Sequence, residues 1–188
     1  MENNNTTPFS DIYNSFLSKV TDDMYMELTK EDTYKILQDL LLSAIPNFEF
    51  PRFNSADYNV SSLNEITIEN DNDEEPIVEE QYEVGYFNSK LTNEEINILA
   101  TYMVVEWLGQ QLASIENTRM KYSGTDFKFT SQANHIQKLI TLKKDYEREG
   151  FHLQRLYKRR TLDKNGQIKS TFDIIMKPLK EGDSNNDD

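Results

Sequence analysis

Apolar residues recur at three- and four-residue steps through much of the chain between residues 91 and 160. In the first part of this stretch the repeating positions are Ile96, Leu99, Met103, Trp107, Leu108, Leu112 and Ile115. This spacing places them on one side of a helix, and a polar segment at 121–126 separates them from a second set. The two apolar stripes can be buried together only if the helices fold back on each other, so the pattern predicts an antiparallel helix hairpin.

The first helix of this hairpin has a clear predicted start. Thr92 is followed three residues later by Glu95, the arrangement of a capping box in which each residue satisfies a backbone N–H of the other. Leu91 and Ile96 flank the box at the spacing of a hydrophobic staple. We therefore expect the helix to begin directly after Thr92.

The second helix is predicted to begin near Thr130 or Ser131 and to continue to about Arg159. Its apolar positions are Ala133, Ile136, Leu139, Ile140, Leu142, Tyr146, Leu153, Leu156 and Tyr157. Because this spacing continues past Gly150, we interpret the glycine as a weak point inside one long helix. The alternative is a helix that stops at Gly150, with the glycine as its C-terminal cap and a strand after it.

Two shorter amphipathic helices are predicted in the first half of the chain. One begins at Thr7 and Pro8, a cap followed by proline in the first turn, and continues to about Val20. The other begins after Thr29 and must end before Pro46, because proline pushes the preceding residue out of the helical conformation. The predicted fold class is therefore mainly α, a helical bundle built on a long antiparallel helix hairpin with one or two β-hairpin excursions.

An aromatic segment follows the second short helix. Phe48, Phe50 and Phe53 alternate around Pro51, which predicts an extended segment because a residue before proline avoids the helical region. One interpretation is an apolar strap that lies across the helices. The other is an anchor for a partner subunit, since aromatic residues and arginine are enriched at interfaces.

Residues 65–69 and 81–87 alternate in polarity and predict the two strands of an antiparallel β-hairpin, inserted at about 62–88. The segment 70–76 between them is predicted to form a solvated tip, because its charge is too high for it to fold alone. Residues 62–83 include nine acidic residues and no basic one. The hairpin is therefore expected to be strongly acidic.

The ends of the chain are predicted to lie outside the helical domain, which spans residues 7–160. Residues 1–6 and 179–188 are short polar or acidic stretches with little to bury, so both are expected to be disordered. Asn165 and Gly166 form a strong hairpin-turn signal, which predicts a C-terminal β-hairpin or arm at 161–178.

Composition narrows the class of function. The 188 residues carry a formal net charge of −13 and no cysteine, which excludes disulfides and cysteine-based metal sites. Such acidity opposes wholesale binding to nucleic acid or to anionic membranes. The N-terminal residues lack the apolar run of a secretory signal, and no stretch reaches about eighteen apolar residues. We expect a soluble protein that is made in the cytoplasm and has no membrane partner.

The residues that usually carry catalysis or bind metals do not form recognisable patterns. The six glycines are scattered singly, and none belongs to a phosphate-binding loop. His135 and His152 lack carboxylates at ligand spacing, so a structural or surface role is favoured for each. No nucleophile motif occurs. The sequence therefore predicts a protein that is not an enzyme and that has no cofactor and no metal.

One basic stretch stands out against the acidic background. Residues 138–160 include eight basic and three acidic residues, a net charge of +5. These cations could complement the C-terminal end of a helix dipole, dock on an acidic surface of a partner or of another copy, or contact nucleic acid. The residues proposed for partner binding are Arg155, Tyr157, Lys158, Arg159, Arg160, Phe48, Phe50 and Phe53.

Four short segments also occur in a characteristic order. They are Leu28-Thr29-Lys30-Glu31-Asp32, Ala44-Ile45-Pro46-Asn47-Phe48-Glu49-Phe50-Pro51-Arg52, Leu91-Thr92-Asn93-Glu94-Glu95-Ile96 with Trp107-Leu108, and Gln154-Arg155-Leu156-Tyr157-Lys158-Arg159-Arg160. In this order they resemble a group of small, cysteine-free virion proteins of tailed bacteriophages, the head–tail connector or neck proteins, over residues 11–160. The acidic hairpin at 62–83 is a departure, because a minimal helical adaptor would not need it.

The resemblance implies a non-enzymatic structural protein of the virion neck, a largely helical connector or adaptor subunit. It implies a homo-oligomeric ring that binds the portal protein and the tail or a second neck protein, lines the DNA path and lies in non-specific proximity to packaged DNA. An acidic hairpin and a basic helix end would supply the two different patches that a ring contact joins. The alternatives are a tail-assembly chaperone or other non-virion assembly factor, and a small nucleic-acid-binding regulator.

Overall fold

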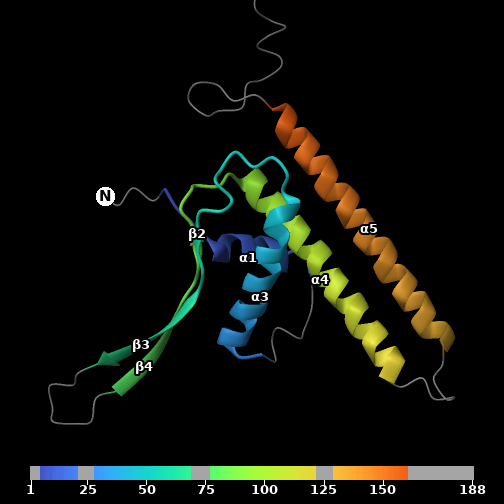
Figure 1. Ribbon diagram of the computed structural model, residues 1–188, viewed down its shortest axis with the longest axis horizontal. Helices are drawn as coiled ribbons and strands as arrows, with labels where there is room; N and C mark the ends of the chain where they lie inside the picture. Colours follow the sequence, from blue (N-terminus) through green and yellow to red (C-terminus); the bar gives the residue numbers. More distant parts are fainter. Residues whose placement is uncertain (1–4, 21–27, 69–76, 122–128, 161–188) are drawn as a thin grey trace, which may run out of the picture.

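Helices form most of the computed structural model, which describes residues 5–20, 28–68, 77–121 and 129–160 (Figure 1). In these parts of the chain the helices are α1 (Phe9–Leu17), α3 (Lys30–Ala44), α4 (Asn93–Lys121) and α5 (Phe129–Arg159), with a short 3-10 turn, η1 (Ile45–Asn47). The predicted class, mainly α with small β excursions, is confirmed. The predictions for residues 1–4, 70–76, 122–126, 161–178 and 179–188 fall outside the described residues.

Helix α4 is the centre of the fold. Helices α1 and α3 pack against it, and α5 lies along another of its sides in the opposite direction, which confirms the antiparallel hairpin (Figure 1). All eight residues from Ile98 to Val105 are buried. The predicted single stripe is therefore too narrow: this part of α4 is covered on every face, as expected for a helix that is apolar all round.

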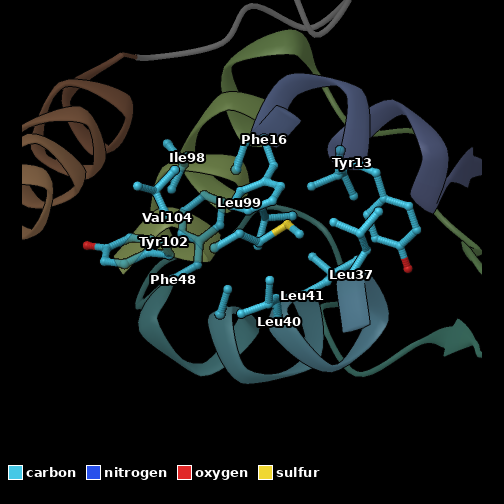
Figure 2. Packing of buried hydrophobic residues seen from close by; sticks show 14 of the residues in the cluster. Tyr13, Phe16, Leu37, Leu40, Leu41, Phe48, Ile98, Leu99, Tyr102 and Val104 are labelled. Carbon is cyan, nitrogen blue, oxygen red and sulfur yellow. The ribbon is translucent and has the colours of Figure 1, made fainter. Parts of the chain in front are cut away.

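The core lies between α4 and the two shorter helices. Figure 2 shows Phe16 of α1 and Leu40 and Leu41 of α3 close to Leu99 of α4. The buried residues of the two short helices are Phe9, Ile12, Tyr13 and Phe16 of α1, and Leu37, Leu40, Leu41 and Ala44 of α3. Because these residues recur at three- and four-residue steps, each short helix turns one apolar side toward α4.

Two of the predicted helix starts are confirmed by their hydrogen bonds. The Thr92 N–H donates to Glu95 Oε2 at 2.7 Å, and the Glu95 N–H donates to Thr92 Oγ1 at 3.3 Å, which completes the capping box of α4. At the start of α3, the Asp32 N–H donates to Thr29 Oγ1 at 3.1 Å. Both caps satisfy backbone N–H groups that have no partner inside the helix.

The predicted cap of the first helix is wrong. Pro8 holds the N-cap position of α1 and makes no side-chain cap hydrogen bond. Thr7 belongs to strand β1 (Thr7–Pro8); its Oγ1 donates to the Ser89 carbonyl at 3.0 Å and accepts from the Leu91 N–H at 2.7 Å. The Thr7 hydroxyl was predicted to cap the helix that follows it. It instead forms hydrogen bonds with residues more than eighty positions away in sequence.

Helix α5 runs through Gly150 without a break, so the predicted long helix is confirmed and the alternative stop at Gly150 is wrong. Gly150 is buried, and a Cβ added there would lie 2.8 Å from Cζ of Tyr102 on α4. Glycine at this position thus lets the two helices approach closely.

Two small antiparallel sheets complete the described chain. In the first, β5 (Tyr86–Phe87) lies between β1 and β2 (Tyr58–Asn59). The second is the hairpin of β3 (Ser62–Ile68) and β4 (Ile77–Glu83), in register from Ser62 opposite Glu83 to Ile68 opposite Ile77.

The hairpin was expected, but its second strand was placed incorrectly at 81–87. The chain leaves the β3–β4 ladder after Glu83, because Gly85 is bound to other segments. Its N–H donates to Ser61 Oγ at 3.0 Å, and its carbonyl accepts from the Phe9 N–H at 2.7 Å. A Cβ at Gly85 would lie 2.5 Å from the Asn59 carbonyl oxygen, so only glycine fits between these segments.

A matched pair of glycine substitutions tests the packing of α4 on α5. We expect Gly150→Ala to lower the free energy of unfolding by about 1–2 kcal/mol, because the new methyl group overpacks against the buried Tyr102 ring. Gly109→Ala, inside α4, should instead raise it by about 0.5–1 kcal/mol, since its Cβ would meet only Lys143 Cε at 3.5 Å. Urea unfolding measures both. Equal effects of the two substitutions would contradict the close approach at Gly150.

Candidate partner-binding surface

A buried tyrosine joins the C-terminal end of α5 to two other parts of the fold. The side chain of Tyr157 is only 1% exposed. Its hydroxyl donates to Glu95 Oε1, in the first turn of α4, and accepts from the backbone N–H of Arg52 at 2.9 Å. One side chain therefore fixes the last turns of α5 relative to the start of α4 and to the aromatic segment 48–53, which we call the strap.

Arg52 of the strap caps the C-terminal end of α5. Its guanidinium lies over the Tyr157 ring, 4.1 Å from the ring centroid. Nη2 donates to the carbonyl oxygen of Tyr157 at 2.6 Å and to that of Arg160. The last carbonyls of a helix have no partner inside the helix, and they carry the negative end of its dipole. The Arg52 guanidinium donates hydrogen bonds to these carbonyls and places a positive charge at the negative end of the dipole.

Gln154 makes a second connection between the strap and α5. Its Nε2 donates to the Asn47 carbonyl at 2.8 Å and to the hydroxyl of Tyr102, while its Oε1 accepts from the Glu49 N–H at 2.9 Å. The side chain is buried and its amide is used at both ends. Gln154 and Tyr157, one helical turn apart, thus bind the strap at two points.

The environment keeps both buried tyrosines neutral. Burial raises the pKa of the Tyr157 hydroxyl well above its ordinary value of 10.0, and its hydrogen bond to Glu95 raises the pKa further. Burial also raises the pKa of Tyr102, an effect that the hydrogen bond from Gln154 partly offsets. Tyr157 therefore remains a hydrogen-bond donor at any pH near neutrality.

The strap and α5 leave a small groove of about 110 Å³ at the surface. Its lining residues are Glu49, Phe50, Phe151, Gln154, Arg155 and Lys158. Two aromatic side chains in it are exposed, Phe50 by 49% and Phe151 by 56%. The Lys158 ammonium lies 3.8 Å from the centroid of the Phe50 ring, a cation–π contact. The groove thus combines apolar surface with two cations and one carboxylate, Glu49.

The residues predicted to bind a partner divide into two groups. Phe48, 4% exposed, packs its ring against Tyr157 and Phe53 at centroid distances of 5.3 and 5.9 Å. Phe48 and Tyr157 are therefore core residues that a partner cannot reach, and the prediction is wrong for both. Phe53 is partly buried against the same core. For these three residues the interpretation of the segment as an apolar strap holds.

The remaining predicted residues lie on the surface. Phe50, Arg155, Lys158 and Arg159 are exposed, and Arg160 forms an ion pair with Glu94 of α4 at 2.9 Å. Within the described residues, neither Arg155 nor Arg159 forms an ion pair. Their charges are thus available to another molecule.

Earlier in α5 two of the cations form ion pairs within the helix. Lys143 pairs with Glu147 at 2.5 Å and Arg148 with Asp145 at 3.2 Å, both within the helix. A second hollow, lined by Lys144, Glu147, Arg148 and Phe151, adjoins the groove through Phe151. Within the described residues, unpaired positive charge therefore remains at Lys138 and Lys144 as well as at the last turns of α5, where Arg155 and Arg159 lie.

Sequence reasoning missed several residues of this surface. Gln154, Arg52, Glu95 and Tyr102 form the hydrogen bonds that hold it, and Phe151 forms half of its aromatic floor. No local signal identifies the role of these four polar residues in the surface, because the partners that they bind there lie 52 to 108 residues away in sequence. Phe151 is different, because it lies off the apolar stripe of its helix. An apolar residue at such a position is a signal in the sequence for an exposed contact residue.

Other kinds of site can be checked on the described residues. No group of three or more His, Cys, Asp or Glu side chains among them is placed to hold a metal ion. No helix in the same part of the chain is long and apolar enough to cross a membrane. His135 and His152 are both exposed on α5.

No protein-family model matches the chain, and neither the curated proteins nor the solved structures include a match. The resemblance to phage connector proteins therefore stays a prediction from the residues.

The Tyr157 hydroxyl offers a direct test of the connection beneath this surface. Tyr157→Phe should lower the free energy of unfolding at pH 7 by about 1–3 kcal/mol, because Glu95 and the Arg52 N–H each lose a buried partner. Tyr146→Phe is the matched control on the same helix, since the Tyr146 hydroxyl makes no hydrogen bond within the described residues. Chemical denaturation of both variants gives the comparison.

The same variant should change the response to alkali. The folded state raises the Tyr157 pKa above 10.0, so the stabilisation is complete below pH 10 and is lost as the pH rises beyond it. Tyr157→Phe should therefore lose stability less steeply than the unmodified chain above pH 10. Parallel pH profiles for the two proteins would show that Tyr157 is not held in its neutral form by the fold.

Proposed function

We propose that the chain is a non-enzymatic structural protein of a tailed-phage virion, a connector-type subunit that forms a ring between portal and tail. The observation that carries this proposal is the β3–β4 hairpin, which projects from the helical body (Figure 1). The two strands contact each other extensively, and neither makes comparable contact with any other element of the described chain. An arm with so little contact to the rest of the described chain suits contact with another protein.

The physical chemistry of the hairpin supports this interpretation. An isolated two-stranded hairpin is marginally stable in water and gains from a third strand or a packed face. Both of its outer edges carry backbone groups that another chain can pair. The register also sets Glu65 opposite Glu80, and like charges in directly opposed positions weaken a strand pair. The arm therefore gains stability when an oppositely charged surface covers it.

The end of α5 supplies a second and different contact surface. It carries the groove residues Phe50 and Phe151 with the cations Arg155, Lys158 and Arg159. A contact between two different patches on successive copies is heterologous, and such contacts close into a ring when the rotation between copies allows it. The net charge of −13 suits a wall beside packaged DNA, because negative surfaces keep phosphates from adhering.

Light scattering tests the proposal most simply. The mass of the purified chain is measured alone and then with purified portal rings and with the virion proteins encoded beside it. The proposal expects a defined ring of this chain on the portal, and the same chain in purified virions by mass spectrometry. A chain that is absent from virions and pairs with a soluble tail protein would instead be an assembly chaperone.

Removal of the arm separates folding from assembly. Replacement of residues 63–82 by Asn-Gly closes Ser62 onto Glu83, which already lie opposite each other, with a two-residue hairpin turn. The helical body should keep its free energy of unfolding within about 1 kcal/mol, because β3 and β4 make no comparable contact with any other element of the described chain. Recruitment to the portal should be lost.

The unmodified chain is the reference for both measurements, which are urea unfolding and co-sedimentation with portal rings. A loss of several kcal/mol on removal of the arm would place the hairpin in the body's core. Undiminished recruitment of the shortened chain would show that the arm is not a docking element.

A further inference from the structure

We infer that the groove between the strap and α5 receives the acidic β3–β4 hairpin of a second copy of this chain. The inference rests on the proposed function and names the contact that would join neighbouring subunits. The groove offers apolar surface from Phe50 and Phe151 and two positive charges from Arg155 and Lys158, which outnumber its single exposed carboxylate, Glu49. No segment of the described chain covers these two exposed rings.

The composition of the groove matches that of a binding hot spot. Energetically important interface residues are enriched in aromatic and arginine side chains set in a small pocket. Each exposed ring leaves apolar surface in water, and burying it on association is favourable at about 25 cal/mol per Å². The groove floor is also rigid, because Gln154 and Tyr157 fix the strap to α5. Little ordering is needed when a partner binds.

The charge of the groove indicates which segment binds there. Residues 62–83 contain nine acidic residues and no basic one, and the groove meets them with Arg155, Lys158 and the adjacent Arg159. The same strands carry apolar residues in their sequence, including Ile66, Ile68, Ile77 and Val78. An acidic ribbon with interspersed apolar residues complements a surface of aromatic rings between cations. We therefore commit to the hairpin, and not to nucleic acid, as the ligand.

The geometry requires that the hairpin come from another copy. In Figure 1 the hairpin leaves the body on the side of α3, whereas α5 lies on the other side of α4. Helix α4 packs against both α3 and α5, so it stands between the two surfaces. In this arrangement the arm of a chain does not reach its own groove. Arm-to-groove contacts are therefore heterologous and propagate from copy to copy.

Charge reversal at both surfaces of the full-length chain provides the test. The groove variant is Arg155→Glu with Lys158→Glu, and the hairpin variant is Glu79→Lys with Glu80→Lys. Analytical ultracentrifugation at about 50 mM salt should detect self-association of the unmodified chain, weaker at high salt. Each variant alone should associate about tenfold or more weakly, since like charges then oppose each other. An equimolar mixture of the two variants should restore association, because every reversed surface regains an opposite partner.

A matched control keeps the total charge constant. Lys35→Glu with Lys90→Glu changes the net charge as much as the groove variant does, at two exposed positions outside the groove. This control should associate like the unmodified chain, apart from the small general effect of added negative charge. Phe151→Ala, which keeps the charge and removes an exposed side chain, should weaken association without lowering the stability of the chain.

Three results would overturn the inference. They are an unmodified chain that stays monomeric at low salt up to millimolar concentration, groove and control variants that associate equally, and a mixture that fails to restore association. Portal binding is measured separately. A chain that associates through the groove but ignores the portal would refute the connector function and leave this contact standing. A groove variant that still forms a full ring on the portal would refute this contact and leave the connector function standing.

Discussion

The structure depends on the burial of α4 on every face. Eight consecutive residues, Ile98 to Val105, lie out of water, and no helix can achieve this alone. Helices α1 and α3 must therefore cover one part of its circumference and α5 another. The close approach at Gly150 follows from the same constraint, because the last turns of α5 have to reach the Tyr102 ring. The two proposed contact surfaces are what remains outside this core.

The groove is a product of how the strap is held. Phe48 enters the core, while Arg52 and the backbone N–H of Glu49 bind the end of α5. Between these anchor points Phe50 is left exposed beside Phe151. The interactions that stabilise the fold therefore also fix the position of the side chains offered to a partner. A surface built in this way is held in place before a partner binds.

Local signals in the sequence predict much of this fold. The capping box at Thr92, the N-cap at Thr29, the helix spacing through Gly150 and the existence of the acidic hairpin are all visible there, because each depends on residues a few positions apart. What local signals cannot supply is the long-range pairing. Thr7 caps no helix because it binds Ser89 and Leu91.

The candidate surface was predictable only in part, for the same reason. Tyr157 stands in a run of cations and was taken for a contact residue, yet its partners are Glu95 and Arg52, far away in sequence. The basic run itself was visible, and Arg155 and Lys158 do reach the surface. The sequence does not show which aromatic residues lie beside these cations. Phe48 is buried and Phe50 is exposed because of the way the strap packs on α5.

Amide hydrogen exchange, measured on the free chain and on its assembled form, shows whether a second copy stabilises the hairpin. We expect fast exchange in β3 and β4 of the free chain, strong protection of α4 in both forms, and new protection of the two strands on assembly. Equal protection of β3 and β4 in the two forms would contradict this expectation, because the hairpin would then gain nothing from a second copy.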